Sequence, residues 1–418
     1  MEKLIVTGNK KLSGDVFISG AKNAVVAIIP AAIIAEGVSI IENLPFIEDV
    51  TSFITTLNGL GINCELLNEN TLKIDSTNIK SSIAINDDVK KIRASYYLMG
   101  ALIGRFKKVE VALPGGCNFG SRPIDQHIRG FKALGIEVIE EDNIIKLDGT
   151  NLKGANIYLD MVSVGATINI MLAAVLAEGV TVIENAAKEP HVVDTANFLN
   201  MLGAKVTGAG TDVIRITGVE KLHGAEYTII PDQIEAGTYM IAAAISGGDV
   251  YVKNIIPKHM DSLVAKLEEM GCYIEQGDDY IRVKSDGNLN AVNVKTMVYP
   301  GFPTDLQPQM TTLLSVANGT STLTENVWEN RFQYIEELKK LGANISLKDR
   351  VATINGVDTF NGGEVKATDL RAGAAMILAG LKSKSPVTIS NVKYIDRGYE
   401  KVEYKLKSIG ADIKRISD

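Results

Sequence analysis

One pattern recurs six times along this chain of 418 residues: an apolar-periodic segment, a glycine, and then alternating apolar residues. A glycine in this place is typical of a helix C-terminus, where the backbone turns left-handed, and the alternation is typical of a strand. A second helix, glycine and strand run in phase with the first, as in AAIIAEGVSIIENLP (31–45). The pattern therefore predicts one α/β unit of about 70 residues used six times. The six glycines are Gly61, Gly135, Gly203, Gly271, Gly342 and Gly410.

Six units in a chain of this length predict two domains of three units each. Apolar helices such as 24–35 and 167–177 would lie inside each domain, with sheets around them. A single elongated array of the same units is the alternative that the repeat leaves open. Two similar domains that face each other form a cleft, which is a usual place for a ligand.

Charge and hydropathy exclude several classes of function. The net charge of -7 disfavours nucleic-acid binding and membrane-surface binding by the chain as a whole, but leaves room for a basic cleft that binds a small anion. The N-terminus does not have the pattern of a signal peptide. The longest apolar run, 24–35, contains Pro30 and is too short to cross a bilayer, so we expect no membrane insertion.

Cysteine and histidine are sparse. Three widely spaced cysteines argue against a disulfide framework and fit a reducing cytoplasm. The four histidines do not cluster and no CxxC occurs, so we expect no structural metal. The stretch GAGTDV (208–213) lacks the third glycine of a dinucleotide fingerprint and is interpreted as a hairpin turn, and no phosphate-binding P-loop motif is present.

The stretch LPGGCNFGSRPID (113–125) places Cys117 among glycines, with Arg122 five positions later. The glycines predict an exposed loop, and a loop thiol beside a cation can act as an acid or a nucleophile. Packing is the commoner role of a cysteine, and it suits Cys64 and Cys272, which follow helix-stop glycines in strand-like sequence.

Two helix starts are candidate anion sites. Lys22 and Asn23 precede a buried apolar helix, where a lysine works against the helix dipole unless an anion lies between them. Ser163 can cap the next such helix and, with the N–H groups of Val164 and Gly165, bind a phosphate. The plainer alternatives are a surface lysine and a simple helix cap.

One carboxylate and several arginines complete the candidate chemistry. Asp305 stands between prolines in FPTDLQPQ, on a loop or a first helical turn, where it can be a general base or a cap. Guanidinium groups that converge on one cleft suit phosphate and carboxylate. The candidate arginines, which fall in different repeats, are Arg93, Arg122, Arg331, Arg371 and Arg397.

Together these stretches resemble the UDP-N-acetylglucosamine 1-carboxyvinyltransferase family, of the EPSP synthase superfamily, over nearly the whole chain. The motifs that carry the resemblance are SGAKNA (19–24), LPGGC..GSRPID (113–125), SVGATINIM (163–171), PHVVDTANFL (190–199), FPTDLQ (302–307), ENRF (329–332), TDLRAGAA (368–375) and IDRGYE (395–400).

The resemblance implies an α/β fold of two inside-out, barrel-like domains, each of three βαβαββ repeats, with the chain crossing between them twice. One domain is implied to span 22–229 and to carry the Cys117 loop. The other combines 1–21 with 230–418 and carries Asp305 and Arg397. The active site is implied to lie in the cleft between the domains.

The implied reaction moves the enolpyruvyl group of phosphoenolpyruvate to the 3'-hydroxyl of UDP-N-acetylglucosamine and releases phosphate. It proceeds by addition and elimination through a tetrahedral ketal and begins peptidoglycan synthesis in the cytoplasm. The implied partners are these two small molecules. No cofactor and no metal are implied, because lysine and arginine neutralise the phosphate. The antibiotic fosfomycin is implied to alkylate Cys117.

The same resemblance implies residue roles. Cys117 protonates the methylene of phosphoenolpyruvate and can form a covalent adduct, and Asp305 takes the hydroxyl proton. Lys22, Arg122 and Arg397 hold phosphoenolpyruvate, and Asn23 lies near the sugar. Further candidate cations are Arg93, Arg331 and Arg371. The implied contacts to the UDP-sugar are Arg122, Pro123, Ile124, Asp125, Ser163, Val164, Gly165 and Val327.

Three positions depart from the family pattern: Met161 and Gln233 replace a lysine and an arginine, and Trp328 replaces a phenylalanine.

Two rival functions stay open. One is transfer to shikimate 3-phosphate, although the N-terminal motif here is AKN rather than SKS. The other is a non-catalytic UDP-sugar-binding paralogue. The sequence leaves the oligomeric state open.

Overall fold

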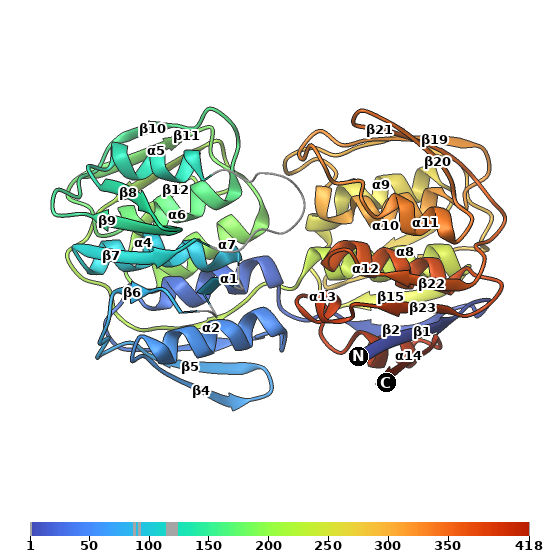
Figure 1. Cartoon of the computed structure of the whole chain (residues 1–418), viewed down its shortest axis with the longest axis horizontal. Helices are drawn as coiled ribbons and strands as arrows, with labels where there is room; N and C mark the ends of the chain where they lie inside the picture. The colour runs from blue at the N-terminus through green and yellow to red at the C-terminus, as the bar shows by residue number, and fades with distance from the viewer. Residues whose placement is uncertain (1, 87–88, 91–92, 114–123, 418) are drawn as a thin grey trace. The chain divides into compact units, whose positions relative to one another are not determined.

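The computed structural model describes residues 2–86, 89–90, 93–113 and 124–417, and the described strands form six four-stranded sheets (Figure 1). Every sheet has the same topology: a parallel pair of strands, followed by two antiparallel neighbours. The described strands stay in separate sheets and do not close into a barrel. The six-fold α/β repeat predicted from the glycine spacing is therefore confirmed.

The chain divides into two compact units, Gly20–Ile230 and Met1–Ser19 with Pro231–Asp418, where the sequence suggested 22–229 and the remainder. The first unit has three sheets. Their strands, in spatial order, are β14 (Glu226–Thr228), β3 (Val38–Glu42), β5 (Thr71–Asp75) and β4 (Asn63–Asn68); β6 (Ile83–Ala84), β7 (Lys108–Ala112), β9 (Ile144–Asp148) and β8 (Glu137–Glu141); and β10 (Asn156–Tyr158), β11 (Val180–Glu184), β13 (Val213–Thr217) and β12 (Lys205–Thr207).

The second unit also has three sheets. Their strands, in spatial order, are β2 (Ser13–Phe17), β15 (Asp249–Lys253), β17 (Tyr280–Lys284) and β16 (Tyr273–Gln276); β18 (Val294–Lys295), β19 (Thr320–Thr324), β21 (Val351–Asn355) and β20 (Asn344–Lys348); and β22 (Gly363–Lys366), β23 (Val387–Ser390), β1 (Glu2–Thr7) and β24 (Asp412–Ser417).

Three strands complete sheets far from their own place in the chain. In the first unit β14 pairs in parallel with β3, Glu226 opposite Ile40, so the end of this unit supplies the first strand of its first sheet. In the second unit β2 pairs in parallel with β15. Strand β1 pairs with β24, Glu2 opposite Ser417, which places the two ends of the chain in one sheet (Figure 1).

Each repeat holds one almost completely buried helix and one amphipathic helix. The buried helices form the inner layer of both cores, because nearly all their side chains are inaccessible to solvent. They are α1 (Lys22–Ala32), α4 (Tyr97–Arg105), α6 (Val164–Ala174), α8 (Gln233–Ser246), α10 (Gln307–Leu314) and α12 (Leu370–Leu381). The amphipathic helices are α2 (Glu48–Gly59), α5 (Asp125–Ala133), α7 (Pro190–Met201), α9 (Asp261–Glu269), α11 (Ile335–Lys340) and α14 (Val402–Ser408).

Shorter elements complete the described chain: η1 (Arg93–Tyr96), η2 (Pro257–Met260), η3 (Thr304–Leu306) and α13 (Lys393–Asp396). The helix-stop glycines behave as predicted. All six have positive φ values, from 78° at Gly135 to 100° at Gly203, a backbone conformation that side chains disfavour. The turn predicted at 208–213 is also confirmed, because it joins the antiparallel strands β12 and β13.

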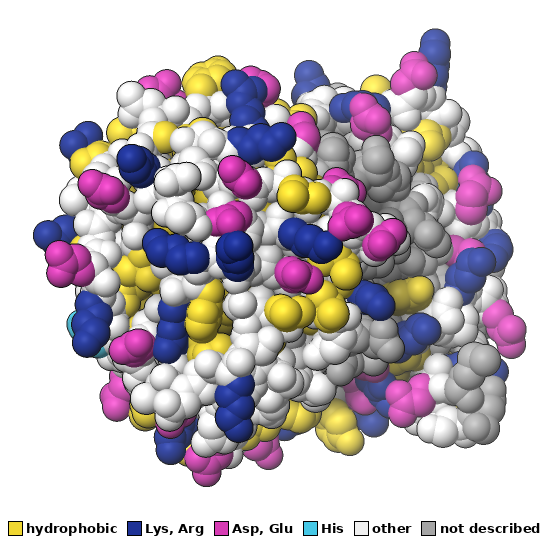
Figure 2. Space-filling model, turned by 60° about the vertical axis from the view of Figure 1, so that its left-hand side comes forward, with side chains coloured by type: hydrophobic (Ala, Val, Ile, Leu, Met, Phe, Trp, Pro, Cys, Tyr) yellow, Lys and Arg dark blue, Asp and Glu magenta, His cyan; other side chains and the backbone are white. Residues whose placement is uncertain are grey.

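Among the described residues, every helix is too short or too polar to span a bilayer. On the face shown in Figure 2, Lys and Arg side chains alternate with Asp and Glu, and no broad area of one sign gathers there.

Candidate active site

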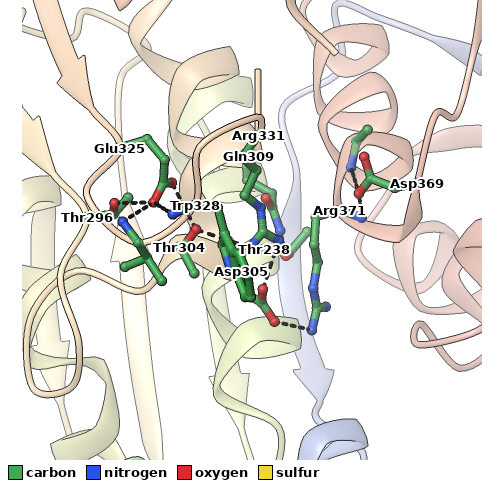
Figure 3. Close-up of polar contacts among 12 residues, drawn as sticks. Thr238, Thr296, Thr304, Asp305, Gln309, Glu325, Trp328, Arg331, Asp369 and Arg371 are labelled. Carbon is green, nitrogen blue, oxygen red and sulfur yellow. Dashed lines mark hydrogen bonds and ion pairs between the residues drawn. The ribbon is translucent and has the colours of Figure 1, made fainter. Parts of the chain in front are cut away.

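Asp305 lies between two arginines that come from distant parts of the second unit (Figure 3). Its Oδ1 is 2.8 Å from Nη2 of Arg331, and its Oδ2 is 3.1 Å from Nη2 of Arg371. Asp305 lies on the short helix η3 directly before α10, and Arg371 is the second residue of α12. Asp369 fixes the start of α12, because its Oδ1 accepts hydrogen bonds from the backbone N–H groups of Arg371 and Ala372.

Both guanidinium groups of this cluster are buried, and they share the single carboxylate of Asp305. The residues Arg331 and Arg371 are 5% and 3% exposed, whereas the side chain of Asp305 is 27% exposed. Among the described residues, Nε of Arg331 and Nη1 of Arg371 have no hydrogen-bond partner. Buried cations with unused donors are costly, so the arrangement suits an anionic ligand that offers paired oxygen atoms.

Burial of Arg371 disfavours its charged form, but the nearby carboxylates of Asp305 and Asp232, together with the Tyr399 hydroxyl, outweigh this and raise the pKa of its guanidinium group above the usual value. The ring of Tyr399 lies under this guanidinium, 5.6 Å from ring centre to Cζ. The hydroxyl of Tyr399 is held by Thr238 at 2.8 Å and by Gln309 at 3.1 Å. Arg371 therefore stays charged and is packed in one orientation.

Glu325 lies beside the cluster and is fully buried. Its Oε2 accepts a hydrogen bond from the Thr304 hydroxyl at 2.8 Å, and its Oε1 accepts one from Thr296 at 2.7 Å. The same Oε1 accepts from the backbone N–H groups of Val327 and Trp328, at 2.8 and 3.1 Å (Figure 3). The half-buried Val327 is thus fixed by its backbone. Arg397 follows α13 as its C-cap residue and is half-buried.

In the first unit, Lys22 opens α1 as predicted, after an N-cap residue, Ala21, that provides no side-chain cap. Its Nζ is 3.3 Å from Oδ2 of Asp49, a buried carboxylate in the first turn of α2. The helix start thus receives a negative charge from the protein itself, which offsets the unfavourable placement of a lysine there. Asn23 follows in the same helix and is half-buried.

The end of η1 and the starts of α5 and α6 meet around one aromatic pair. The rings of Tyr96 and His127 are 4.7 Å apart, edge to face. A Cβ atom on Gly165 would lie 2.9 Å from the Tyr96 hydroxyl and 3.0 Å from Nε2 of His127, so any larger residue would displace one of these two side chains. Nδ1 of His127 lies 3.0 Å from Nδ2 of Asn169.

This meeting point gathers most of the UDP-sugar contacts expected in the first unit. Ser163 is the N-cap of α6, and its hydroxyl accepts a hydrogen bond from Ala166, which confirms the predicted cap. Val164 and Gly165 form the first turn of that helix. Ile124 and Asp125 begin α5. The two helix starts are joined because Gln126 accepts a hydrogen bond from the backbone of Asp160, at 3.1 Å.

Several expected residues fall outside the described part of the chain: Cys117, Arg122, Pro123 and the side chain of Arg93. The three positions that depart from the family pattern lie within the described residues. Met161 is exposed, before the start of α6. Gln233 begins α8, whose N-cap is Asp232, and Trp328 is half-buried beside Val327.

Sequence reasoning missed Asp49, Glu325 and His127. A polar residue in an otherwise apolar helix is a usable signal, and Asn169, the partner of His127, is one. The sequence around Glu325 and Asp49 contains no pattern that would single out either residue. Within the described ranges, no three His, Cys, Asp or Glu side chains converge in a way that could hold a metal ion.

A profile of the family described as EPSP synthase (3-phosphoshikimate 1-carboxyvinyltransferase) matches residues 6–406. The chain is 57% identical over 417 residues to UDP-N-acetylglucosamine 1-carboxyvinyltransferase of Clostridium botulinum, covering 100% of both chains. It is 56% identical to UDP-N-acetylglucosamine 1-carboxyvinyltransferase 2 of Clostridium acetobutylicum, covering 99% of both. The crystal structure of the enolpyruvyl transferase NikO from Streptomyces tendae matches with a TM-score of 0.90 at 26% identity, over 100% of this chain and 99% of that one.

Proposed function

Because this chain belongs to the EPSP synthase family, we propose that it transfers the enolpyruvyl group of phosphoenolpyruvate to the 3'-hydroxyl of UDP-N-acetylglucosamine and releases phosphate. The observation that carries the proposal is the identity of 56% and 57%, over the whole chain, to relatives named for that reaction. The reaction would begin peptidoglycan synthesis, and the sparse cysteines fit a cytoplasmic setting.

The Asp305 cluster supports this chemistry in the second unit. Phosphoenolpyruvate carries a carboxylate and a phosphate, and Arg331 and Arg371 offer buried guanidinium donors of the kind that bind such groups bidentately. We assign to Asp305 the acceptance of the proton from the attacking hydroxyl. A carboxylate held by two cations at 2.8 and 3.1 Å keeps one orientation, which a general base requires. Arg397 is assigned to phosphoenolpyruvate.

Residues of the first unit are assigned to the same reaction. The cap of α6 offers the N–H groups of Val164 and Gly165 to a phosphate oxygen, and Lys22 adds a positive charge at the start of α1. Cys117 is assigned to protonate the methylene carbon, with Arg122 and Arg93 as further cations. The proposal thus requires both units to contribute residues to one reaction.

The test is release of phosphate from phosphoenolpyruvate, measured with and without UDP-N-acetylglucosamine. Release should depend on the UDP-sugar and should fall below one per cent of wild type, on the order of a hundredfold or more, in Cys117→Ala and Asp305→Ala. Asp358→Asn, a change at an exposed aspartate of the same unit, is the matched control and should retain activity. Release that instead depends on shikimate 3-phosphate, or no release at all, would overturn the proposal.

A further inference from the structure

We propose that Glu325 is a positioning residue with two separate tasks: through Oε2 it orients Asp305, and through Oε1 it shapes the loop that contacts the UDP-sugar. The inference rests on the proposed function. It assigns roles to Thr304 and Thr296 as well, because each hydroxyl serves one of the two oxygen atoms.

The first task runs through three consecutive contacts. Thr304 donates its hydroxyl proton to Oε2 of Glu325 at 2.8 Å, which turns the hydroxyl lone pairs toward Arg331. Nη1 of Arg331 then donates to the Thr304 oxygen at 3.1 Å. Nη2 of the same guanidinium donates to Asp305 at 2.8 Å. Since a guanidinium is a rigid plane, fixing Nη1 fixes the direction from which Nη2 reaches Asp305.

The second task concerns residues 326–328. Oε1 of Glu325 accepts from the N–H groups of Val327 and Trp328, which closes a tight turn on its own side chain. Thr296 ties this turn to its neighbour, because its hydroxyl donates to Oε1 at 2.7 Å and accepts from the N–H of Asn326 at 2.9 Å. Three consecutive N–H groups are therefore held by two buried side chains, 0% exposed at both Glu325 and Thr296.

Burial makes this arrangement informative. A carboxylate removed from water costs free energy unless its oxygens are hydrogen-bonded, and here four donors satisfy the two oxygens. Thr304 directly precedes Asp305, and the two N–H donors belong to the turn that contains Val327. Thr296 holds the same turn through Asn326. An apolar side chain of similar size would fill the same buried space without that cost, so the carboxylate at position 325 is explained by the orientation of these donors.

Two threonine variants separate the tasks. Thr304→Val removes only the Oε2 contact and the acceptor for Arg331, so kcat should fall by roughly 10- to 100-fold while KM for UDP-N-acetylglucosamine stays the same. Thr296→Val removes only the Oε1 contact and the acceptor for Asn326, so KM for the UDP-sugar should rise by about tenfold while kcat stays the same. Thr304→Ser and Thr296→Ser retain the hydroxyl and should restore wild-type values.

Glu325→Gln provides the third test. Its amide oxygen should face the three donors at the Oε1 position, which leaves the amide N–H₂ facing Thr304, so this variant should resemble Thr304→Val and not Thr296→Val. Equal effects of both threonine variants on one parameter, or no rescue by serine, would overturn the inference while leaving the proposed function intact. A wild-type protein without UDP-sugar-dependent phosphate release would overturn the proposed function itself, and the inference with it.

Discussion

Asp305 and Arg371 are 66 residues apart in the chain and meet in the fold, Nη2 to Oδ2, at 3.1 Å. Further hydrogen bonds fix both residues of this ion pair. The N-cap of α12 fixes the backbone of Arg371, and Arg331 fixes the other oxygen of Asp305. The pair therefore behaves as one preorganised group.

Arg371→Lys should separate geometry from charge. Lysine keeps the positive charge but loses the planar fork, so kcat/KM for phosphoenolpyruvate should fall by roughly 100-fold. Steady-state phosphate release measures this. The matched control is Arg350→Lys, because Arg350 pairs with Glu329 at 2.8 Å on the surface, where both side chains are exposed. A similar loss in both variants would show that the orientation of Arg371 is unimportant.

Asp194 should make stability depend on pH. Burial raises the pKa of its carboxyl group from 3.8 to about 6, although hydrogen bonds from Tyr227 and Ile230 lower it. Between about pH 4 and pH 6 the folded protein keeps a proton that the unfolded chain releases, so this group's contribution to the free energy of unfolding falls as pH rises. Asp194→Asn abolishes that titration.

Urea unfolding of wild type and Asp194→Asn between about pH 4 and pH 7 tests this. The difference in unfolding free energy should move in favour of the variant by roughly 2–3 kcal/mol as pH rises. Asp212→Asn, at an exposed site of the same unit, is the control. A difference for Asp194→Asn that does not change with pH would contradict the prediction.

Gly165→Ala should raise KM for the UDP-sugar by about tenfold, because the new methyl group displaces the ring of His127 or Tyr96 from the start of α6. Gly104→Ala is the matched control. It lies in α4, its nearest neighbours would be 3.6 Å away, and alanine favours a helix by about 1 kcal/mol over glycine. The prediction fails if KM is unchanged in Gly165→Ala.

Thiol labelling should be selective. Burial raises the pKa of Cys64 to about 12 and that of Cys272 to about 11, so both are protonated and unreactive at neutral pH. Iodoacetamide at about pH 7.5 should therefore modify Cys117 first, as located by mass spectrometry of the folded protein. Cys117→Ser should lose the fast reaction. Equally rapid modification of Cys64 would contradict this assignment of reactivity.

Local features were predictable because they depend on neighbouring residues. A glycine after an apolar helix must supply a left-handed turn, and Gly61 and Gly410 do so. Ser163 caps α6 because a hydroxyl one residue before a helix finds free N–H groups. The buried helices expected at 24–35 and 167–177 followed from their largely apolar sequence.

Contacts between distant residues were not predictable from pattern alone. The residue type of Asp49 or Glu325 carries no sign of its partner, since Lys22 and Thr304 meet them only through packing of different elements. The family resemblance supplied Asp305, Arg331 and Arg371 individually. That Arg331 and Arg371 bond opposite oxygens of Asp305 came from the fold.

Because β1, β2 and β14 complete sheets far from their own place in the chain, they affect the order in which the two units can fold during synthesis. Strands β1 and β2 leave the ribosome first, yet their partners β24 and β15 are made much later. The Gly20–Ile230 unit needs no such wait, because β14 completes its first sheet as soon as residue 228 emerges. Vectorial synthesis thus favours folding of the Gly20–Ile230 unit first, while β2 stays unpaired until β15 is made and β1 stays unpaired until β23 and β24 arrive.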